Sequence, residues 1–301
     1  MTDKVAQTFT GSVAIVGRPN VGKSTLLNAI LGEKLSITSK KPQTTRHRIL
    51  GVKTDPPYQV IYLDTPGFHK NTPHSLNRAM NRTVISVLQE ADLILFVVDC
   101  RRWTEEDDLV LLRLKERAQP VILVMNKVDT IDERLLLLPK IQEWSTKMDF
   151  LAIVPLSAIR ERNIPILEKV VHEHLPEGAP IFADDDLSDV TDQFMVTELI
   201  REKLMRLLGD EVPYATTVQV EKFEDGETLL RIAALIWVEK DSQKAIVIGH
   251  KGEKLKKVGQ LAREDMELLF GKKVFLHLWV KVKSGWSDDD HLLRHLGYVN
   301  R

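Results

Sequence analysis

The sequence predicts an α/β domain, with a mostly parallel sheet and helices on both faces, followed by a smaller α+β domain. Its 301 residues are enough for two hydrophobic cores at roughly 100–200 residues per domain. Residues 11–175 alternate short apolar runs with longer amphipathic stretches, which is typical of strand–helix–strand units. This alternation stops at Pro176–Pro180, which has two prolines and a glycine, and the elements restart in a different order after it.

The first domain contains five apolar runs, nearly free of polar residues, as expected for strands buried on both faces. These runs are Val13–Val16, Tyr58–Leu63, Leu93–Val98, Val121–Met125 and Ala152–Pro155. Between them, Glu105–Arg117 and Glu133–Asp149 are long enough to form crossover helices. Pro56 and Pro57 separate two strand-like runs, so we expect a hairpin there at one edge of the sheet.

The second domain is predicted at residues 192–283, after a linker at 176–191 and before a tail at 284–301 that packs on it. Its first element is a helix capped by Asp192 and stopped by Gly209, because apolar residues recur between them at helical spacing. The following elements are predicted as strand, strand, helix, helix and strand: Thr217–Phe223, Leu229–Val238, Ala245–Ile248, a helix to Phe270, and Val274–Lys283.

Composition excludes several classes of protein. The net charge of -1 argues against a globally basic nucleic-acid binder, although it leaves local basic surfaces open. Cys100 is the single cysteine and cannot form an internal disulfide, and Met1–Ser12 lacks the pattern of a signal peptide. The most apolar runs are far shorter than the ~20 residues that span a bilayer. We therefore expect a soluble cytoplasmic protein.

A phosphate-binding loop is predicted at residues 17–24, whose sequence GRPNVGKS fits the pattern G-x-x-x-x-G-K-[ST]. It lies between the strand-like run Val13–Val16 and a helical stretch, which is the context that this motif requires. Backbone N–H groups of such a loop surround the β-phosphate, and the helix that starts at Lys23 points its positive end at the same anion. We expect Lys23 to reach the β- and γ-phosphates and the Ser24 hydroxyl to ligate Mg²⁺.

The base of the nucleotide is predicted to be guanine. Asn126-Lys127-Val128-Asp129 directly follows a buried strand, and the Asp129 carboxylate can accept hydrogen bonds from the N1–H and the 2-amino group of guanine. Adenine offers neither donor at these positions. Asn126 can bond the other edge of the base, and the Lys127 stem can lie over its face. Ser157-Ala158 follows the strand Ala152–Pro155 and can offer a backbone N–H to the guanine O6.

Two further segments predict a switch that senses the γ-phosphate. Asp64-Thr65-Pro66-Gly67 ends the strand Tyr58–Leu63, so Asp64 can hold Mg²⁺ through water and the Gly67 N–H can bind the γ-phosphate. The polar loop between Gly32 and Arg48 contains Thr44-Thr45, of which we favour Thr45 as a Mg²⁺ ligand. Loss of the γ-phosphate would release the threonine and Gly67 together, as in the order–disorder switch of a GTPase.

An RNA-binding turn is predicted at Gly249-His250-Lys251-Gly252, a G-x-x-G that joins Ala245–Ile248 to the next helix. Local charge supports this prediction, because residues 243–283 contain ten basic and four acidic side chains in a chain of net charge -1. The segment resembles the KH module, whose G-x-x-G loop clamps about four nucleotides of single-stranded RNA. The expected RNA contacts are Ile248, Gly249, His250, Lys251, Gly252, Lys254, Lys256 and Lys257.

The last strand leaves two interpretations of its outward face. Phe275, His277 and Trp279 alternate with inward-pointing aliphatic residues and are followed by Lys281 and Lys283. Aromatic rings among lysines can stack on bases. A neighbouring domain or the tail can instead cover this face, and we favour the second interpretation.

The motifs at 17–24, 44–45, 64–67, 126–129 and 157–158 together resemble the translation-factor-like branch of P-loop GTPases. With Pro42–Arg46, the G-x-x-G turn and Val280–Trp286, they resemble the Era family over nearly the whole chain. The resemblance implies an α/β P-loop GTPase domain at residues 1–175 and an α+β type II KH RNA-binding domain at residues 192–283.

The resemblance also implies an activity and partners. It implies binding of GTP and GDP with Mg²⁺, slow GTP hydrolysis, and binding of 16S rRNA near its 3′ end through the KH domain during assembly of the 30S subunit. It further implies a cytoplasmic protein that associates loosely, as a peripheral protein, with the inner face of the plasma membrane; we expect a monomer. The residues expected to contact GTP are Gly17, Arg18, Pro19, Asn20, Val21, Gly22, Lys23, Ser24, Thr25, Asp64, Thr65, Pro66, Gly67, Phe68, Asn126, Lys127, Val128, Asp129, Ser157 and Ala158.

Hydrolysis is expected to depend on Asn20, Lys23, Thr45 and Gly67, with Ser24, Thr45 and Asp64 as the Mg²⁺ ligands. Ras-like proteins carry a glutamine after Asp-x-x-Gly that orients the attacking water, but Phe68 stands there in this chain and cannot do so. Related GTPases with asparagine at the position of Asn20 use it to hold K⁺, so the resemblance implies stimulation by K⁺. The alternative is that Asn20 only braces the loop.

Three functions are compatible with these motifs. The protein is a GTPase switch that clamps RNA in one nucleotide state, a phosphotransferase that acts on a small molecule, or an RNA-binding scaffold that holds GTP and seldom hydrolyses it. A phosphotransferase does not account for the guanine-specific residues Asn126–Asp129. Because Phe68 cannot orient the attacking water, the scaffold function stays compatible with the sequence. We favour the switch.

Overall fold

A computed structural model describes residues 7–39, 41–68, 74–131, 134–209 and 211–298, which form two compact units. One unit comprises residues 1–36, 45–72 and 80–189, and the other comprises residues 37–44, 73–79 and 190–301. The chain therefore crosses between the units several times. Among the described residues, no helix combines the length and the apolar character that a membrane crossing requires.

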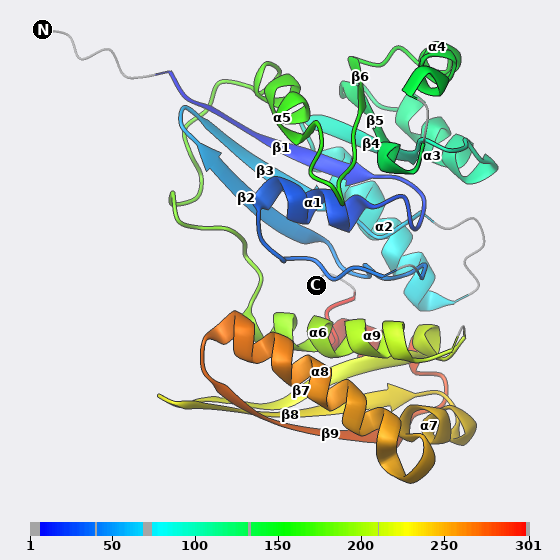
Figure 1. The fold of residues 1–301 in the computed structure, drawn as a ribbon, viewed down its shortest axis with the longest axis vertical. Helices are drawn as coiled ribbons and strands as arrows, with labels where there is room; N and C mark the ends of the chain where they lie inside the picture. The colour runs from blue at the N-terminus through cyan, green and yellow to red at the C-terminus, as the bar shows by residue number, and fades with distance from the viewer. Residues whose placement is uncertain (1–6, 40, 69–73, 132–133, 210, 299–301) are drawn as a thin grey trace, which may run out of the picture. The chain divides into compact units, whose positions relative to one another are not determined.

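The first unit is built on a six-stranded sheet with the order β2-β3-β1-β4-β5-β6 (Figure 1). The strands are β1 (Phe9–Val16), β2 (Ile49–Asp55), β3 (Tyr58–Asp64), β4 (Leu93–Asp99), β5 (Val121–Asn126) and β6 (Ala152–Pro155). All neighbours are parallel except β2 and β3, which form an antiparallel hairpin at one edge. This arrangement confirms the predicted sheet, and the hairpin turns at Pro56 and Pro57 as expected.

Helices cover both faces of this sheet, which is why β4 is buried along its whole length. The helices are α1 (Lys23–Leu31), α2 (Ser75–Glu90), α3 (Glu105–Lys115), α4 (Leu137–Ser145) and α5 (Ile164–His172). Apolar residues of α2, α3 and α4 share one core with the sheet, while α1 contacts β1, β2 and β3, and α5 contacts β6. Figure 1 shows α1 and α5 together in front of the sheet.

Two predicted helices differ in length from those in the structure. The stretch Glu133–Asp149 contains a short 3₁₀ turn at Arg134–Leu136 followed by α4, and residues 132–133 lie outside the described part of the chain. Pro139 falls in the first turn of α4, where a missing N–H costs no helical hydrogen bond. Helix α3, predicted at Glu105–Arg117, ends at Lys115, two residues earlier than predicted.

The segment predicted as a linker runs along the first unit as far as Asp189. Gly178 donates its N–H to the Thr8 carbonyl at 3.0 Å, and the Leu187 carbonyl accepts from Val52 of β2 at 2.8 Å. Gln59 of β3 binds the backbone of Phe182 through both amide atoms. The bond from Val52 satisfies a backbone group of the edge strand β2, which would otherwise lie open.

The second unit has a three-stranded sheet in the order β7-β8-β9, with α6 and α8 on one face (Figure 1). Its elements are α6 (Asp192–Leu207), β7 (Thr216–Asp225), β8 (Leu229–Val238), α7 (Asp241–Ile248), α8 (Glu253–Phe270), β9 (Lys273–Val282) and α9 (Asp290–His295). Strand β8 is antiparallel to β7 and parallel to β9. The order helix, strand, strand, helix, helix, strand confirms the prediction.

The cap of α6 was predicted one residue too late. Thr191 has extended backbone dihedral angles, and its hydroxyl accepts the N–H of Phe194 at 3.3 Å, whereas Asp192 is already helical. Both residue types cap helices well, so the sequence pattern alone does not separate them.

The tail contributes a small apolar cluster formed by Leu76, Trp286, Leu292, Leu293 and Tyr298. The Tyr298 hydroxyl lies 2.9 Å from the Thr217 hydroxyl of β7, which ties the tail to that strand. The outward face of β9 is not covered along its length, because Phe275 is 60% exposed and His277 is exposed too. The favoured interpretation of that face, burial under a tail or a domain, is therefore wrong for these two residues.

Candidate nucleotide and RNA sites

The phosphate-binding loop connects the end of β1 to the start of α1, as its motif predicts. Gly17 has a φ of +153°, and a Cβ there would lie 2.3 Å from the Val97 carbonyl oxygen of β4. No side chain fits that space, so the loop can pass close to the sheet only with glycine at this position. The N-terminal N–H groups of α1 then face the loop, which forms a site for an anion.

Lys23 lies inside this loop. Its side chain is buried, and its Nζ donates to the carbonyl oxygens of Gly17 and Arg18, both at 3.1 Å. Burial lowers the pKa of Lys23 to about 8, an effect opposed by the nearby Asp64 carboxylate. A phosphate group in the loop supplies the negative charge that restores the protonated form of such a lysine.

Three oxygen-bearing side chains from separate segments meet next to Lys23. The hydroxyls of Ser24 and Thr45 are 2.7 Å apart, and Ser24 donates to Asp64 Oδ2 at 2.7 Å. Asp64 is fully buried, its pKa is raised by burial, and its Oδ1 has no hydrogen-bond partner among the described residues. A buried carboxylate oxygen without a partner, beside two hydroxyls, fits Mg²⁺, which binds few protein oxygens and completes its shell with water and phosphate.

The structure places Thr45, rather than Thr44, at this cluster. The Thr44 hydroxyl instead donates to the Lys41 carbonyl oxygen at 2.7 Å. The sequence could not separate the two threonines, because they are adjacent and both hydroxyls are chemically suitable.

The segment after Asp64 returns towards the loop. Thr65 donates its hydroxyl to the Ile15 carbonyl oxygen at 2.8 Å, and an added Cβ at Gly67 would lie 2.7 Å from Pro19. Phe68 is partly buried and packs against the apolar core under the sheet. The Phe68 ring therefore packs in the core, where a polar side chain that orients water would not fit.

The predicted base-reading residues converge around Asn126 at the end of β5. Asn126 Nδ2 donates to the Val21 carbonyl oxygen at 2.8 Å, and its Oδ1 accepts the N–H groups of Lys127 at 2.7 Å and Ala158 at 3.0 Å. Asp129 accepts a hydrogen bond from the Ser157 hydroxyl. Asn126 thus joins three loops and connects the segments predicted to bind the base with the loop predicted to bind the phosphates.

The G-x-x-G turn joins α7 to α8 and contains two residues in the left-handed region, Lys251 with a φ of +48° and Gly252 with +82°. Gly249 has a φ of +73°, and a Cβ there would lie 2.9 Å from the Lys254 side chain. His250 and Lys251 are exposed at the tip of the turn. The exposed cations and the close turn suit the approach of a phosphate backbone.

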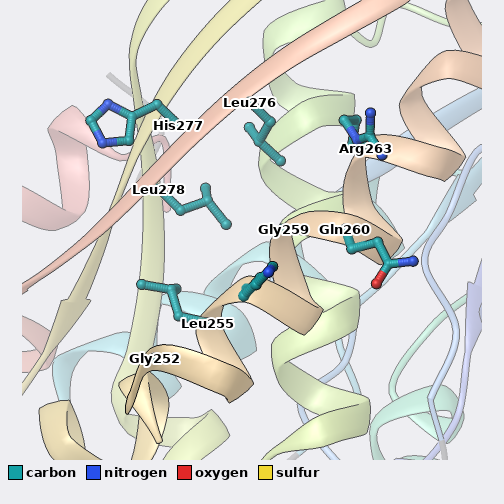
Figure 2. Close-up of a pocket in the computed structure, with 9 residues that line it drawn as sticks. Gly252, Leu255, Gly259, Gln260, Arg263, Leu276, His277 and Leu278 are labelled. Carbon is teal, nitrogen blue, oxygen red and sulfur yellow. The ribbon is translucent and has the colours of Figure 1, made fainter.

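A groove of about 620 Å³ lies between α8 and β9 and begins at this turn (Figure 2). Figure 2 shows Leu276 and Leu278 projecting from β9 towards α8, while His277 projects to the other side of the strand. The groove is lined by Gly252, Leu255, Lys256, Gly259, Gln260, Arg263, Leu276, His277 and Leu278. An apolar floor with polar and cationic groups at its rim is suited to unstacked bases.

Comparisons with known proteins agree with these two sites. A family model described as "50S ribosome-binding GTPase" matches residues 12–127, and one described as "KH domain" matches residues 211–287. The chain is 54% identical to GTPase Era of Marinobacter nauticus, over 95% of this chain and 94% of that one. It is 52% identical to GTPase Era of Glaesserella parasuis over the full length of both chains. The chain belongs to the Era family of GTPases.

Solved Era structures share the fold. A crystal structure of an Aquifex aeolicus Era variant bound to GDP.AlF4- matches with a TM-score of 0.94 at 40% identity, covering 97% of this chain and all of that one. The same values hold for a crystal structure of Era in complex with MgGDPNP and nucleotides 1506–1542 of 16S ribosomal RNA. The predicted P-loop GTPase domain with a C-terminal KH domain is therefore confirmed, and this Era-family chain is a GTPase that converts GTP and water to GDP and phosphate.

Sequence reasoning missed part of this Era-family site. Arg18 donates to Asp107 at 3.1 Å, and Asp107 also accepts the N–H of Thr104 as part of the cap of α3. Lys127 Nζ lies 3.0 Å from Asp99 at the end of β4 and donates to the Asn20 carbonyl oxygen at 2.5 Å. The available signal was the position of these acidic residues: Asp99 ends β4 and Asp107 lies in the first turn of α3, at the edge of the parallel sheet where such loops meet.

The groove of this Era-family chain also differs from its predicted residue set. Of the expected RNA contacts, Gly252 and Lys256 line the groove. Leu276 and Leu278 of β9 were not in that set, because strand residues about 20 positions away along the chain come next to α8 only in the folded domain, whereas His277 was considered only for the outward face of the strand. Gly259 was missed too, although a glycine inside a helix is a signal of close approach by a neighbour or ligand.

Proposed function

We propose that this GTPase is a nucleotide-controlled RNA-binding protein that recognises single-stranded RNA near the 3′ end of 16S rRNA and acts in assembly of the 30S subunit. The observation that supports it best is the groove between α8 and β9, which begins at the exposed cations of the G-x-x-G turn. The Era relative in complex with a 16S rRNA fragment supports the choice of RNA. On the family resemblance, the proposal includes that the protein is a monomer and that it associates loosely with the inner face of the plasma membrane.

The nucleotide chemistry proposed here uses residues already in contact. Ser24 and Thr45 would bind Mg²⁺ directly and Asp64 through water, and the bound ion would neutralise charge between the β- and γ-phosphates. Lys23 binds the same phosphates as its ammonium form. Since Phe68 packs into the core, no side chain at that position orients the attacking water, and unassisted turnover should be slow.

K⁺ should accelerate GTP hydrolysis relative to Na⁺ at matched ionic strength. Asn20 adopts a φ of +64°, is exposed, and its carbonyl oxygen is held by Lys127 Nζ, so its side chain is free to face a cation at the loop. We expect about a tenfold higher rate in K⁺, or ~1.4 kcal/mol of transition-state stabilisation. Phosphate release in KCl and NaCl measures it. Asn20→Ala should abolish the difference, and equal rates for the unaltered protein would leave Asn20 as a brace only.

RNA affinity should depend on the bound nucleotide. We expect at least a tenfold difference, about 1.4 kcal/mol, between the GDP form and the form with a non-hydrolysable GTP analogue. Fluorescence anisotropy with a single-stranded oligonucleotide from the 16S rRNA 3′ end measures it at one fixed salt concentration, because phosphate contacts make affinity depend on ionic strength. A scrambled oligonucleotide of equal length is the control. Equal affinities in both states would favour a scaffold whose two domains act in parallel.

A further inference from the structure

Helix α6 bonds to Thr38, Gln43 and Thr44, which lie in the segment directly before Thr45. These residues belong to the second compact unit, whereas Thr45 belongs to the first. Arg201 of α6 donates to the carbonyl oxygens of Gln43, at 3.4 Å, and Thr44. Glu202, the next residue of α6, accepts the Thr38 N–H at 3.1 Å. Both ends of the segment are thus bonded to neighbouring residues of one helix.

Arg201 is fixed in place by a second set of contacts. It is fully buried, and its Nε and Nη2 donate to the two carboxylate oxygens of Glu198, both at 2.7 Å. A planar guanidinium held by two parallel hydrogen bonds keeps its direction, so its remaining donors point at the loop carbonyls. A buried ion pair is costly unless its remaining donors are satisfied, and the Gln43 and Thr44 carbonyl oxygens satisfy them here.

The conformation of the loop needs such support. Gln43 has a φ of +56°, a region that residues with a Cβ rarely adopt and that persists only when surrounding contacts impose it. The peptide bond after Thr44 leads directly to Thr45, whose hydroxyl is 2.7 Å from that of Ser24. The backbone direction at Thr44 therefore decides whether the Thr45 hydroxyl reaches the Mg²⁺ ligand set.

We propose that Arg201 is a positioning residue for GTP: by holding the carbonyls of Gln43 and Thr44, it presents Thr45 to Mg²⁺ and the γ-phosphate. This inference rests on the proposed nucleotide chemistry. Because a switch threonine binds the Mg²⁺ and γ-phosphate of GTP, the contribution of Arg201 is selective for the triphosphate over GDP. Arg201 lies on α6, in the same compact unit as the residues that it holds, Gln43 and Thr44.

The test is the ratio of the affinities for a non-hydrolysable GTP analogue and for GDP, measured with Mg²⁺ by titration of fluorescent nucleotides. Arg201→Lys keeps the charge but cannot bind both Glu198 oxygens and two carbonyls. We expect this variant to lose about tenfold or more in analogue affinity and to keep its GDP affinity. Arg206→Lys is the matched control, because Arg206 is on the same helix and donates to Thr38, far along the loop from Thr45. This control should leave the ratio unchanged.

An unchanged ratio in a folded Arg201→Lys variant, or equal losses for both nucleotides, would overturn the proposal. If Arg201→Lys fails to fold by circular dichroism, Glu198→Gln gives the same test, because it loosens the guanidinium while preserving side-chain size; a selective loss supports the proposal and an unchanged ratio overturns it. Failure of the unaltered protein to bind the analogue with Mg²⁺ would instead count against the proposed function itself.

Discussion

Replacing Asp129 with asparagine should change the base that this protein binds. The carboxylate accepts two hydrogen bonds from guanine in the proposed site, and an amide nitrogen there would face two donors instead. Contacts to a charged group are worth roughly 1.5–3 kcal/mol each, so GTP affinity should fall about 100-fold or more. Xanthine nucleotides carry an oxygen where guanine has its amino group, so their affinity should rise. Competition between labelled GDP and xanthosine diphosphate measures the exchange.

Asp129→Ala is the control for this result. It removes the carboxylate without adding a donor, so the affinity for GTP should fall and the affinity for xanthine nucleotides should not rise. Ser157 donates its hydroxyl to Asp129 and can donate equally to the asparagine carbonyl, so the asparagine variant should keep the loop intact. Retained preference for guanine would remove Asp129 from the base-reading role.

Replacing His250 and Lys251 together with aspartate should abolish RNA binding and leave GTP affinity unchanged. Both side chains are exposed at the turn where the groove begins, so the substitution should not disturb the core. Losing two contacts to phosphate and adding two negative charges should cost about 100-fold or more in RNA affinity and make the salt dependence shallower. Anisotropy at several salt concentrations measures both effects.

Arg113→Asp with Lys115→Asp is the control for net charge, since it also introduces two aspartates in place of two exposed residues, here an arginine and a lysine on α3 of the first unit. If this pair weakens RNA binding as much as the turn variant does, the effect is one of net charge. If RNA affinity survives the turn variant, the basic surface of the second unit binds elsewhere than at the groove.

Most of the fold was predictable because its signals are local. Uninterrupted apolar runs such as Leu93–Val98 mark strands buried on both faces, and the positions of β4 and β5 agree with prediction to within one residue. The end of α4 and the cap of α6 were not predicted, since several residues near each boundary are equally suitable. The exposure of Phe275 was missed because only the fold decides where the tail packs.

The sequence by itself determined the chemistry of the nucleotide site. The spacing of the loop that ends in Lys23 and Ser24 reflects the backbone geometry needed around a phosphate. The segment that ends in Asp129 reflects the hydrogen-bond donors and acceptors of guanine. Those requirements act over a few neighbouring residues, so they are visible in the chain. The same is true of the G-x-x-G turn, where glycine and a short basic run suffice.

Only the tertiary structure decided which distant residues complete these sites. It brought Thr45 rather than Thr44 to Ser24, added Leu276 and Leu278 to the groove beside α8, and placed Arg201 on the carbonyl of Thr44. Each of these contacts joins residues separated by about 20 or more positions. Their formation depends on packing and burial across the whole fold, for which no local pattern of residues is a sufficient signal.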